Sequence, residues 1–153
     1  MKELLNKIIK NIFISEGESH IKFILSDNSE MIYATNGDCC SETWFSDFTG
    51  IDCLINEEIF EIEELELPYD GEMLLAQRSR QEEDKLYGYC FKTQKGYSTL
   101  EYRNSSNGYY GGSCGLIIPK PDDLDYYYKG LYNDYQKKKN EIIFHEIKDD
   151  WSA

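Results

Sequence analysis

The chain has 153 residues, of which 41% are hydrophobic and 14% aromatic, so it is long enough for one folded domain and too apolar for a disordered chain. Its formal net charge of −13, from 29 acidic and 16 basic residues, disfavours direct binding to DNA, RNA or anionic membranes. The N-terminal residues have an early acid and lack the apolar run of a signal peptide, and no stretch reaches the roughly 18 apolar residues of a membrane span. We therefore expect a cytoplasmic protein whose five cysteines are free, metal-bound or redox-active.

The first half of the chain predicts two helices, a hairpin and a strand. Residues 2–10 have apolar side chains at helical spacing, which predicts a short amphipathic helix. Alternating residues in 19–25 and 30–35, separated by a Ser-Asp-Asn-Ser cluster, predict a β-hairpin. Residues 42–56 carry aromatic and aliphatic side chains near helical spacing around a glycine, which predicts a short or broken helix. Residues 59–67 alternate acids with apolar residues, which predicts a strand whose acids face water.

The second half begins with a charged stretch, residues 68–84, which predicts a long excursion with some helix. Residues 86–93 and 97–103 are rich in Tyr, Phe and Thr and flank Gln-Lys-Gly, which predicts a second hairpin, and residues 114–118 predict one more strand. Residues 124–135 have helical spacing. The pattern of residues 141–148 fits either a helix or a final strand.

Together these elements predict an α+β fold in a single domain, built on a mainly antiparallel sheet. A short N-terminal helix and one or two further helices would pack on the sheet. Pro119 and Pro121 mark a boundary between a core of residues 1–118 and a Tyr- and Lys-rich C-terminal extension, residues 119–153, packed on that core.

Cysteines are the first candidate site. Zinc takes about four thiolate or imidazole ligands in a tetrahedron. Four cysteines would supply them if the glycine-rich loop folds back over the cysteine pair, with His20 and His145 as spare ligands; they are Cys39, Cys40, Cys53 and Cys114. The alternative is that each cysteine is an ordinary buried or free thiol, because a free cysteine behaves as a small hydrophobe.

The second candidate site is the loop that contains Tyr109 and Tyr110. Its glycines allow a close backbone approach, and tyrosine combines rigid apolar area with a polar tip, as is typical of binding surfaces. The alternative is a tight turn whose tyrosines seal the core. Arg103 would pair with Asp38 or Glu42 near this loop, or lie on the surface.

Two motifs in the chain, Gly-Asp-Cys-Cys-Ser at residues 37–41 followed by Trp44, and Ser-Asn-Gly-Tyr-Tyr-Gly-Gly at residues 106–112, resemble the signatures of an uncharacterised domain family found mostly in bacteriophages and prophages. The resemblance covers about residues 10–113. The cysteine pair and Cys53 match the family pattern, whereas Cys90 and Cys114 do not. The family is a domain of unknown function, so the resemblance implies a setting and no reaction.

Charge and setting together suggest a phage-encoded inhibitor of a bacterial defence system, most concretely an anti-CRISPR-like protein that binds a Cas nuclease and blocks nucleic-acid engagement. The expected partner-binding residues are acids and tyrosines: Glu61, Glu63, Glu64, Glu66, Tyr109, Tyr110, Asp122, Asp123 and Asp125. An alternative is a protein that sequesters a nucleotide signal through stacking and phosphate contacts of Trp44, Arg103, Tyr109 and Tyr110.

A metal-dependent enzyme is the third possibility. The chain has no phosphate-binding loop, and no spacing of acids singles out a hydrolytic pair. Only two histidines are available to activate a cysteine nucleophile. We therefore expect no enzymatic activity.

Overall fold

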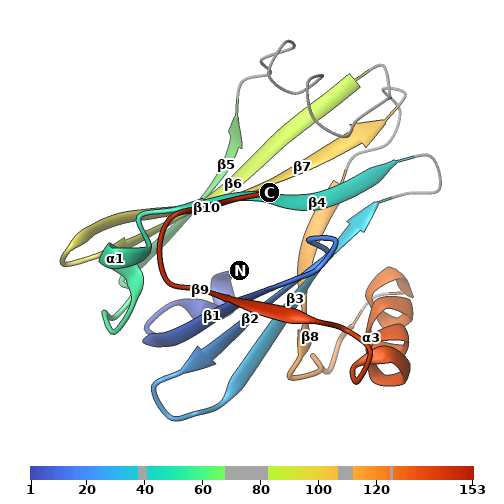
Figure 1. Ribbon diagram of the computed structural model, residues 1–153, viewed down its shortest axis with the longest axis horizontal. Helices are drawn as coiled ribbons and strands as arrows, with labels where there is room; N and C mark the ends of the chain where they lie inside the picture. Colours follow the sequence, from blue (N-terminus) through green and yellow to red (C-terminus); the bar gives the residue numbers. More distant parts are fainter. Residues whose placement is uncertain (38–40, 68–82, 107–111, 125) are drawn as a thin grey trace.

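The protein is a β-sandwich of two five-stranded antiparallel sheets (Figure 1). The computed structural model describes residues 1–37, 41–67, 83–106, 112–124 and 126–153. The first sheet has the order β8-β3-β2-β1-β9, and the second has the order β10-β4-β7-β6-β5. The strands are β1 (Ile9–Ser15), β2 (His20–Leu25), β3 (Glu30–Gly37), β4 (Glu42–Thr49), β5 (Glu61–Leu67), β6 (Glu83–Thr93), β7 (Gly96–Ser106), β8 (Gly112–Ile118), β9 (Phe144–Ile147) and β10 (Trp151–Ser152).

Helix is confined, in the described residues, to a 3-10 turn η1 (Lys2–Leu4), a single turn α1 (Ile51–Leu54) and one longer helix α3 (Tyr126–Lys138). The prediction of an α+β fold is therefore wrong: two stacked sheets make the main core, and among the described helices only α3 packs on the face of a sheet. None of these helices is long and apolar enough to cross a membrane.

Both predicted hairpins are confirmed. In the first, β2 pairs with β3, with Phe23 opposite Met31. In the second, β6 pairs with β7 over eleven register positions, from Glu83 opposite Ser106 to Thr93 opposite Gly96. The predicted strands at residues 59–67 and 114–118 are present as β5 and β8, whereas the predicted excursion lies almost entirely outside the described residues.

The predicted helix over residues 42–56 is wrong for most of its length, because residues 42–49 form β4 and only α1 is helical. The register of β4 against β7 shifts between Phe45 and Asp47, so Ser46 is an extra residue in a β-bulge. After the bulge, Phe45 and Phe48 both face the core although they are three residues apart. A bulged strand thus reproduces the apolar spacing of a helix.

The predicted N-terminal helix over residues 2–10 is also wrong beyond its first turn. The backbone is already extended at Leu5, directly after η1, Asn6 has a φ of 65°, and β1 starts at Ile9. Here too the register shifts, between Ile9 and Asn11, so that Ile9 and Ile12 both enter the core.

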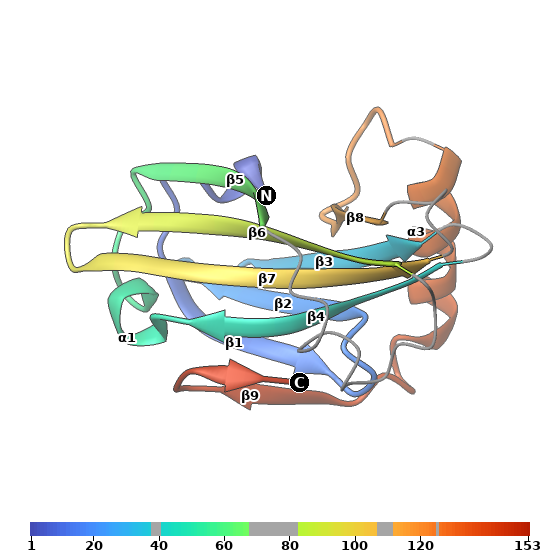
Figure 2. The ribbon, with the colours of Figure 1, turned by 90° about the horizontal axis from the view of Figure 1, so that it is seen from above.

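The main core lies between the two sheets and is rich in aromatic side chains. Phe23 of the first sheet meets Phe48 of the second edge to face, with ring centroids 6.4 Å apart. Phe48 in turn contacts Phe91, and Tyr102 contacts Phe45. Figure 2 shows the second sheet lying over the first. The buried side chains of the main core come from both sheets.

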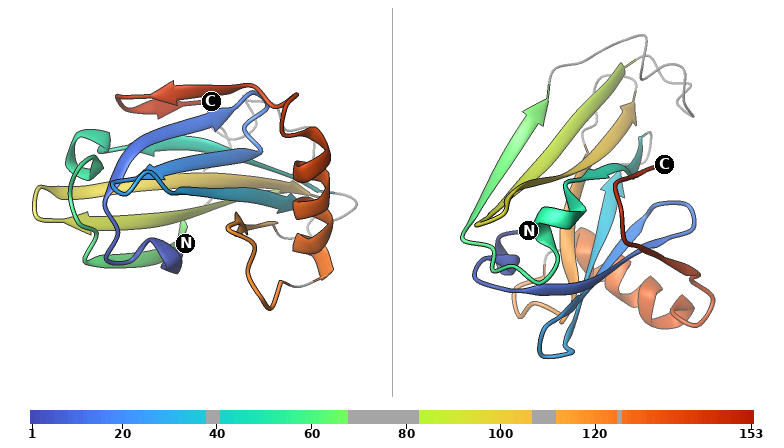
Figure 3. Two further views of the ribbon diagram at one scale, coloured as in Figure 1. Left: turned by 90° about the horizontal axis from the view of Figure 1, so that it is seen from below. Right: turned by 60° about the vertical axis from the view of Figure 1, so that its left-hand side comes forward.

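A smaller apolar cluster lies on the outer face of the first sheet, beneath α3. It joins Ile32 and Ala34 of β3 and Ile117 of β8 to Tyr135 of α3. Gly115 leaves the space that the Tyr128 ring occupies, since a Cβ added there would stand 2.6 Å from Tyr128 Cε1. One helix therefore packs on the sheet, on the face turned away from the second sheet (Figure 3).

The residues after α3 connect the two sheets. Residues 144–147 form strand β9, which answers the open choice between helix and strand, and β9 pairs with β1. Four residues later, β10 pairs with β4 of the second sheet. Between them, Asp150 Oδ1 accepts a hydrogen bond from the Gly50 N–H at 2.8 Å, next to α1. Residues 119–153 thus supply an edge strand to each sheet as well as α3.

Candidate functional site

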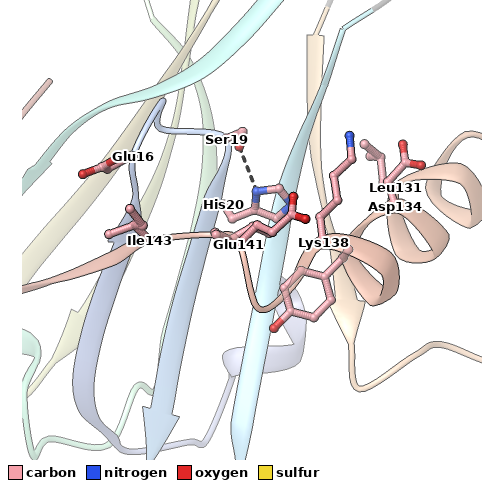
Figure 4. A pocket seen from close by; sticks show the side chains of 10 residues that line it. Glu16, Ser19, His20, Leu131, Asp134, Lys138, Glu141 and Ile143 are labelled. Carbon is pink, nitrogen blue, oxygen red and sulfur yellow. Dashed lines mark hydrogen bonds between the residues drawn. The ribbon is translucent and has the colours of Figure 1, made fainter.

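A cleft of about 480 Å³ lies between α3, the start of β2 and the segment that leads into β9 (Figure 4). We call it the α3 cleft. Its size is within the usual range of small-ligand sites, roughly 300–1,000 Å³. It is lined by Glu16, Ser19, His20, Leu131, Asp134, Tyr135, Lys138, Glu141, Ile142 and Ile143.

His20 and Tyr135 contribute the aromatic surface of the α3 cleft. Their ring centroids lie 5.9 Å apart, and Tyr135 is only 8% exposed. The Nδ1 atom of His20 shares a 2.8 Å hydrogen bond with the hydroxyl of Ser19. Burial lowers the pKa of His20, because a charged imidazole is poorly solvated there. Burial therefore favours the neutral form of the ring.

Charged side chains surround the opening of the α3 cleft. Glu16, Asp134 and Glu141 are exposed carboxylates, and Lys138 is the one lining ammonium. Three negative charges and one positive charge give a local excess of two negative charges. Glu16 has a partner, because its Oε1 lies 3.0 Å from Nε2 of His145. The described residues form no ion pair with Asp134 or Glu141.

A second polar region lies where β3, β4, β7 and β8 meet, at the ends that flank the two sequence motifs. Gly37 is opposite Gly112 in the first sheet, and Thr43 is opposite Asn104 in the second. Asn104 Nδ2 donates to Thr43 Oγ1 at 2.8 Å, and Thr43 Oγ1 donates to the Asn36 carbonyl at 3.2 Å. The fold thus brings the flanks of the two motifs together.

Glycine is required at this junction. A Cβ added to Gly112 would collide with Thr43 Oγ1 and would stand 2.9 Å from the side chain of Asn104. The glycine of the second motif is thus explained at this position by close packing between the sheets. The loop residues Tyr109 and Tyr110, and Cys39 and Cys40 of the first motif, lie outside the described residues.

Arg103 and Trp44, the predicted nucleotide-binding residues, are opposite each other in the β4–β7 pair. They are 3% and 1% exposed, so the described structure presents neither as an open stacking surface. Arg103 Nη2 lies 3.7 Å from Asp47 Oδ2, a carboxylate that the sequence did not suggest as its partner. The expected partner Asp38 lies outside the described residues. Its Nε and Nη1 atoms have no hydrogen-bond partner in the described part of the chain.

A carboxyl pair adjoins Arg103. Asp47 is directly opposite Glu101 in the β4–β7 pair. Burial raises the pKa of Glu101, and the neighbouring carboxylate of Asp47 raises it further, while Arg103 acts in the opposite direction. The sequence did not predict the pairing of Asp47 with Glu101, because two residues on different strands become neighbours only through the register of those strands.

Two of the four predicted zinc ligands, Cys53 and Cys114, lie in the described residues. Cys53 lies in α1, where its Sγ donates to the Lys95 carbonyl at 3.6 Å. Cys114 lies in β8, is half-buried and packs against the main core. Burial raises the pKa of its thiol to about 12. Ser41 is the described residue next to the cysteine pair. The whole of β4, which has eight residues and is roughly 26 Å long, separates it along the chain from Cys53.

Within the residues described, no three His, Cys, Asp or Glu side chains are grouped closely enough to hold a metal ion. His20 lines the α3 cleft, and His145 pairs with Glu16. A zinc site that uses Cys39 and Cys40 stays a prediction.

The predicted partner-binding acids are divided between two places. Four are exposed along β5, the edge strand of the second sheet: Glu61, Glu63, Glu64 and Glu66. Lys92 lies 3.4 Å from Glu61 and 3.6 Å from Glu63. Asp122 and Asp123 are exposed before α3, and Asp125 lies outside the described residues.

The sequence did not predict the α3 cleft. His20 stood out only as a spare metal ligand, and the acids of α3 had no visible connection to it. The cleft joins residues more than 100 positions apart, so no local spacing could reveal it. One available signal was the Ser19-His20 pair at the start of a predicted strand, followed far downstream by an amphipathic helix.

A family model described as a domain of unknown function, DUF7448, matches residues 2–116. Both motifs lie within the matched residues, and α3, β9 and β10 follow it. The uncharacterized protein L278 of Acanthamoeba polyphaga mimivirus is 33% identical to the chain over 114 residues, which are 71% of this chain and 83% of that protein. No solved structure matches the chain significantly.

Proposed function

The chain belongs to the DUF7448 family, and from this premise we propose that it is a virus-encoded binding protein that inhibits a basic, nucleic-acid-binding protein of the host. In a phage or prophage the most concrete partner is a Cas nuclease, whose nucleic-acid engagement the protein would block as an anti-CRISPR. The viral relative supports a viral setting, and the resemblance of the two motifs to phage and prophage domains supports the bacterial one.

The acidic edge strand β5 carries this proposal. Its four glutamates span five residue intervals, or roughly 17 Å of extended strand. One strand of B-DNA carries about five phosphates over that length. The charge density of β5 is therefore close to that of a nucleic-acid strand, and a surface of Lys and Arg that binds nucleic acid suits it.

The β5 glutamates are only partly neutralised within the molecule. Lys92 lies near Glu61 and Glu63, whereas Glu64 and Glu66 form no ion pair with the described residues. Acids on an edge strand also oppose edge-to-edge aggregation. The two roles differ in their consequences, because only a binding role makes inhibition depend on these particular acids.

The test compares two variants with the same change in net charge. In the first, Glu61, Glu63, Glu64 and Glu66 become Gln. In the control, four exposed acids away from β5 become amides: Glu30→Gln, Asp52→Asn, Glu146→Gln and Asp149→Asn. Binding and inhibition of DNA cleavage are measured with a panel of purified Cas effectors at micromolar protein.

We expect the wild type and the control to bind and inhibit, and the β5 variant to lose at least about tenfold in affinity, since each rim charge contributes to electrostatic complementarity. Equal loss in both variants would indicate a nonspecific charge effect. Absence of binding and inhibition by the wild type would rule out the proposal for the effectors tested.

A nucleotide-sequestering function is the second candidate, and one observation favours it. Arg103 is buried, yet its Nε and Nη1 atoms have no hydrogen-bond partner in the described chain, and a phosphate that reached the guanidinium group would accept from both. A thermal-shift panel of nucleotides tests this function: a ligand at 100 times its dissociation constant stabilises the folded state by about 2.7 kcal/mol. No shift with any nucleotide of the panel would exclude those ligands.

A further inference from the structure

The α3 cleft has two kinds of surface that suit one ligand. Its inner part combines the rings of His20 and Tyr135 with the aliphatic side chains of Leu131, Ile142 and Ile143. Ile143 is 54% exposed, so part of this apolar surface is in contact with solvent in the absence of a ligand. An alkyl stem would gain free energy by covering it.

The opening of the cleft selects the charge of the ligand. Asp134 and Glu141 are exposed carboxylates without an ion-pair partner among the residues described, whereas Glu16 pairs with His145. Figure 4 shows Glu141 beside His20 and Asp134 on α3 near Lys138. The two available carboxylates outnumber the single ammonium, so an anion is disfavoured and a cation is favoured.

We propose that the α3 cleft binds an alkyl ammonium or guanidinium cation, presented as a lysine or arginine side chain of a partner protein. Such a side chain combines a methylene stem with a charged head, as the apolar wall and the acidic opening require. The proposal that a partner protein presents this cation rests on the proposed function, in which the partner is rich in Lys and Arg. The proposal that the cleft binds such a cation does not. Free polyamines carry the same chemistry and are distinguished in the test.

The test uses the full chain and needs no partner protein. Two-dimensional ¹H–¹⁵N and ¹H–¹³C NMR spectra follow titration with Nα-acetyl-L-arginine amide, Nα-acetyl-L-lysine amide and spermidine in parallel. The variant carries Asp134→Asn and Glu141→Gln. Its control carries Asp52→Asn and Glu58→Gln, the same charge change at two exposed acids near α1, which Figure 1 places far from α3.

We expect saturable shifts of His20, Ile142 and Ile143 signals with the amino-acid amides. The Asp134/Glu141 variant should raise the dissociation constant at least about tenfold, and the Asp52/Glu58 variant should change it less than about twofold. Loss of binding only in the first variant supports the proposal, provided that its spectrum shows a folded protein.

Three results would overturn it: shifts spread over the surface without saturation, equal weakening in both variants, or spermidine binding that exceeds the amides by far more than its higher charge explains. The last result would identify a free polyamine as the ligand. Because β5 is unchanged throughout, the cleft can bind the amides even if no Cas effector is inhibited, and the two proposals fail separately.

Discussion

The substitution Gly115→Ala tests whether α3 is held on the first sheet by close packing. Gly115 is opposite Ala34 in the β3–β8 pair, on the face that α3 covers. An added Cβ would stand 2.6 Å from Cε1 and 2.7 Å from Cζ of Tyr128. Carbon atoms in good contact are about 3.5–4.0 Å apart, so the ring must retreat by roughly 1 Å.

The cost follows from what anchors that ring. The hydroxyl of Tyr128 shares a 2.7 Å hydrogen bond with Ser113 Oγ, and the ring packs with the cluster beneath α3. Overpacking of this kind costs about 1–3 kcal/mol. Each kcal/mol shifts the Tm of a domain of this size by roughly 2–4 °C, so we expect Gly115→Ala to lower the Tm by roughly 2–12 °C.

Gly130→Ala is the matched control, because it makes the same substitution within α3 where an added Cβ meets nothing within 4 Å. Alanine is the better helix former by about 0.5–1 kcal/mol, so this variant should be slightly more stable than the wild type. Thermal unfolding followed by circular dichroism measures both. Adding Tyr128→Leu to Gly115→Ala should recover part of the loss. A Gly115→Ala protein as stable as the wild type would refute the packing argument.

Three further predictions concern single residues. Burial lowers the pKa of His20 below its unfolded value of about 6.5. The stability that the neutral ring contributes is therefore present above that pH and is lost as the pH falls toward the folded pKa. Between about pH 7.5 and 5, the Tm of His20→Gln should fall less than the Tm of the wild type. Parallel curves would contradict this. Burial raises the thiol pKa of Cys114 to about 12, so little of it is thiolate at about pH 8. Iodoacetamide at that pH should alkylate Cys53 in the folded protein well before Cys114, as measured by peptide mapping. Equal alkylation rates would contradict this prediction. Gly50 has a φ of 71°, and a Cβ added there would collide with the Tyr97 carbonyl. Gly50→Ala should therefore lower the free energy of unfolding in urea by at least about 2 kcal/mol. An unchanged urea midpoint would show that the backbone moves to accommodate the Cβ.

Alternation and turn chemistry were sufficient to predict the hairpins. Residues 86–103 combine β-branched and aromatic residues with a Gln-Lys-Gly turn, and Gly96 takes a φ of 144° in that turn. The signal is local, because the two strands are neighbours in sequence and their register is determined by the turn.

The two wrong helices share one physical cause. A β-bulge at Ser46 places Phe45 and Phe48 on the same face, and another bulge near Lys10 does so for Ile9 and Ile12. Each bulge converts the two-residue period of a strand into a three-residue step, which is close to the helical period. The sequence pattern alone does not distinguish the two, and the error changed the predicted class from two sheets to one sheet with helices.

The residues of the candidate site were harder to predict from local sequence patterns than the strands of the fold. The β5 glutamates were predicted to face water, and all four are exposed. Alternation accounts for one face of the strand only, because the consecutive residues Glu63 and Glu64 lie on opposite faces. The burial of Trp44 and Arg103 could not be predicted, because they lie on the face of the β4–β7 pair opposite the core residues Phe45 and Tyr102, where alternation predicts exposure. The α3 cleft needs the outer face of the first sheet and a helix from the far end of the sequence.

The last strands have a consequence for folding. Ile147 of β9 pairs with Ile12, and Trp151 of β10 pairs with Phe48, so each sheet acquires an edge from residues made about 100 or more positions later. Contacts of such sequence separation are entropically expensive and slow to form. On the ribosome, β1 and β4 must therefore wait with open edges until Ser152 has emerged. We expect the nascent protein to need protection from aggregation during this interval.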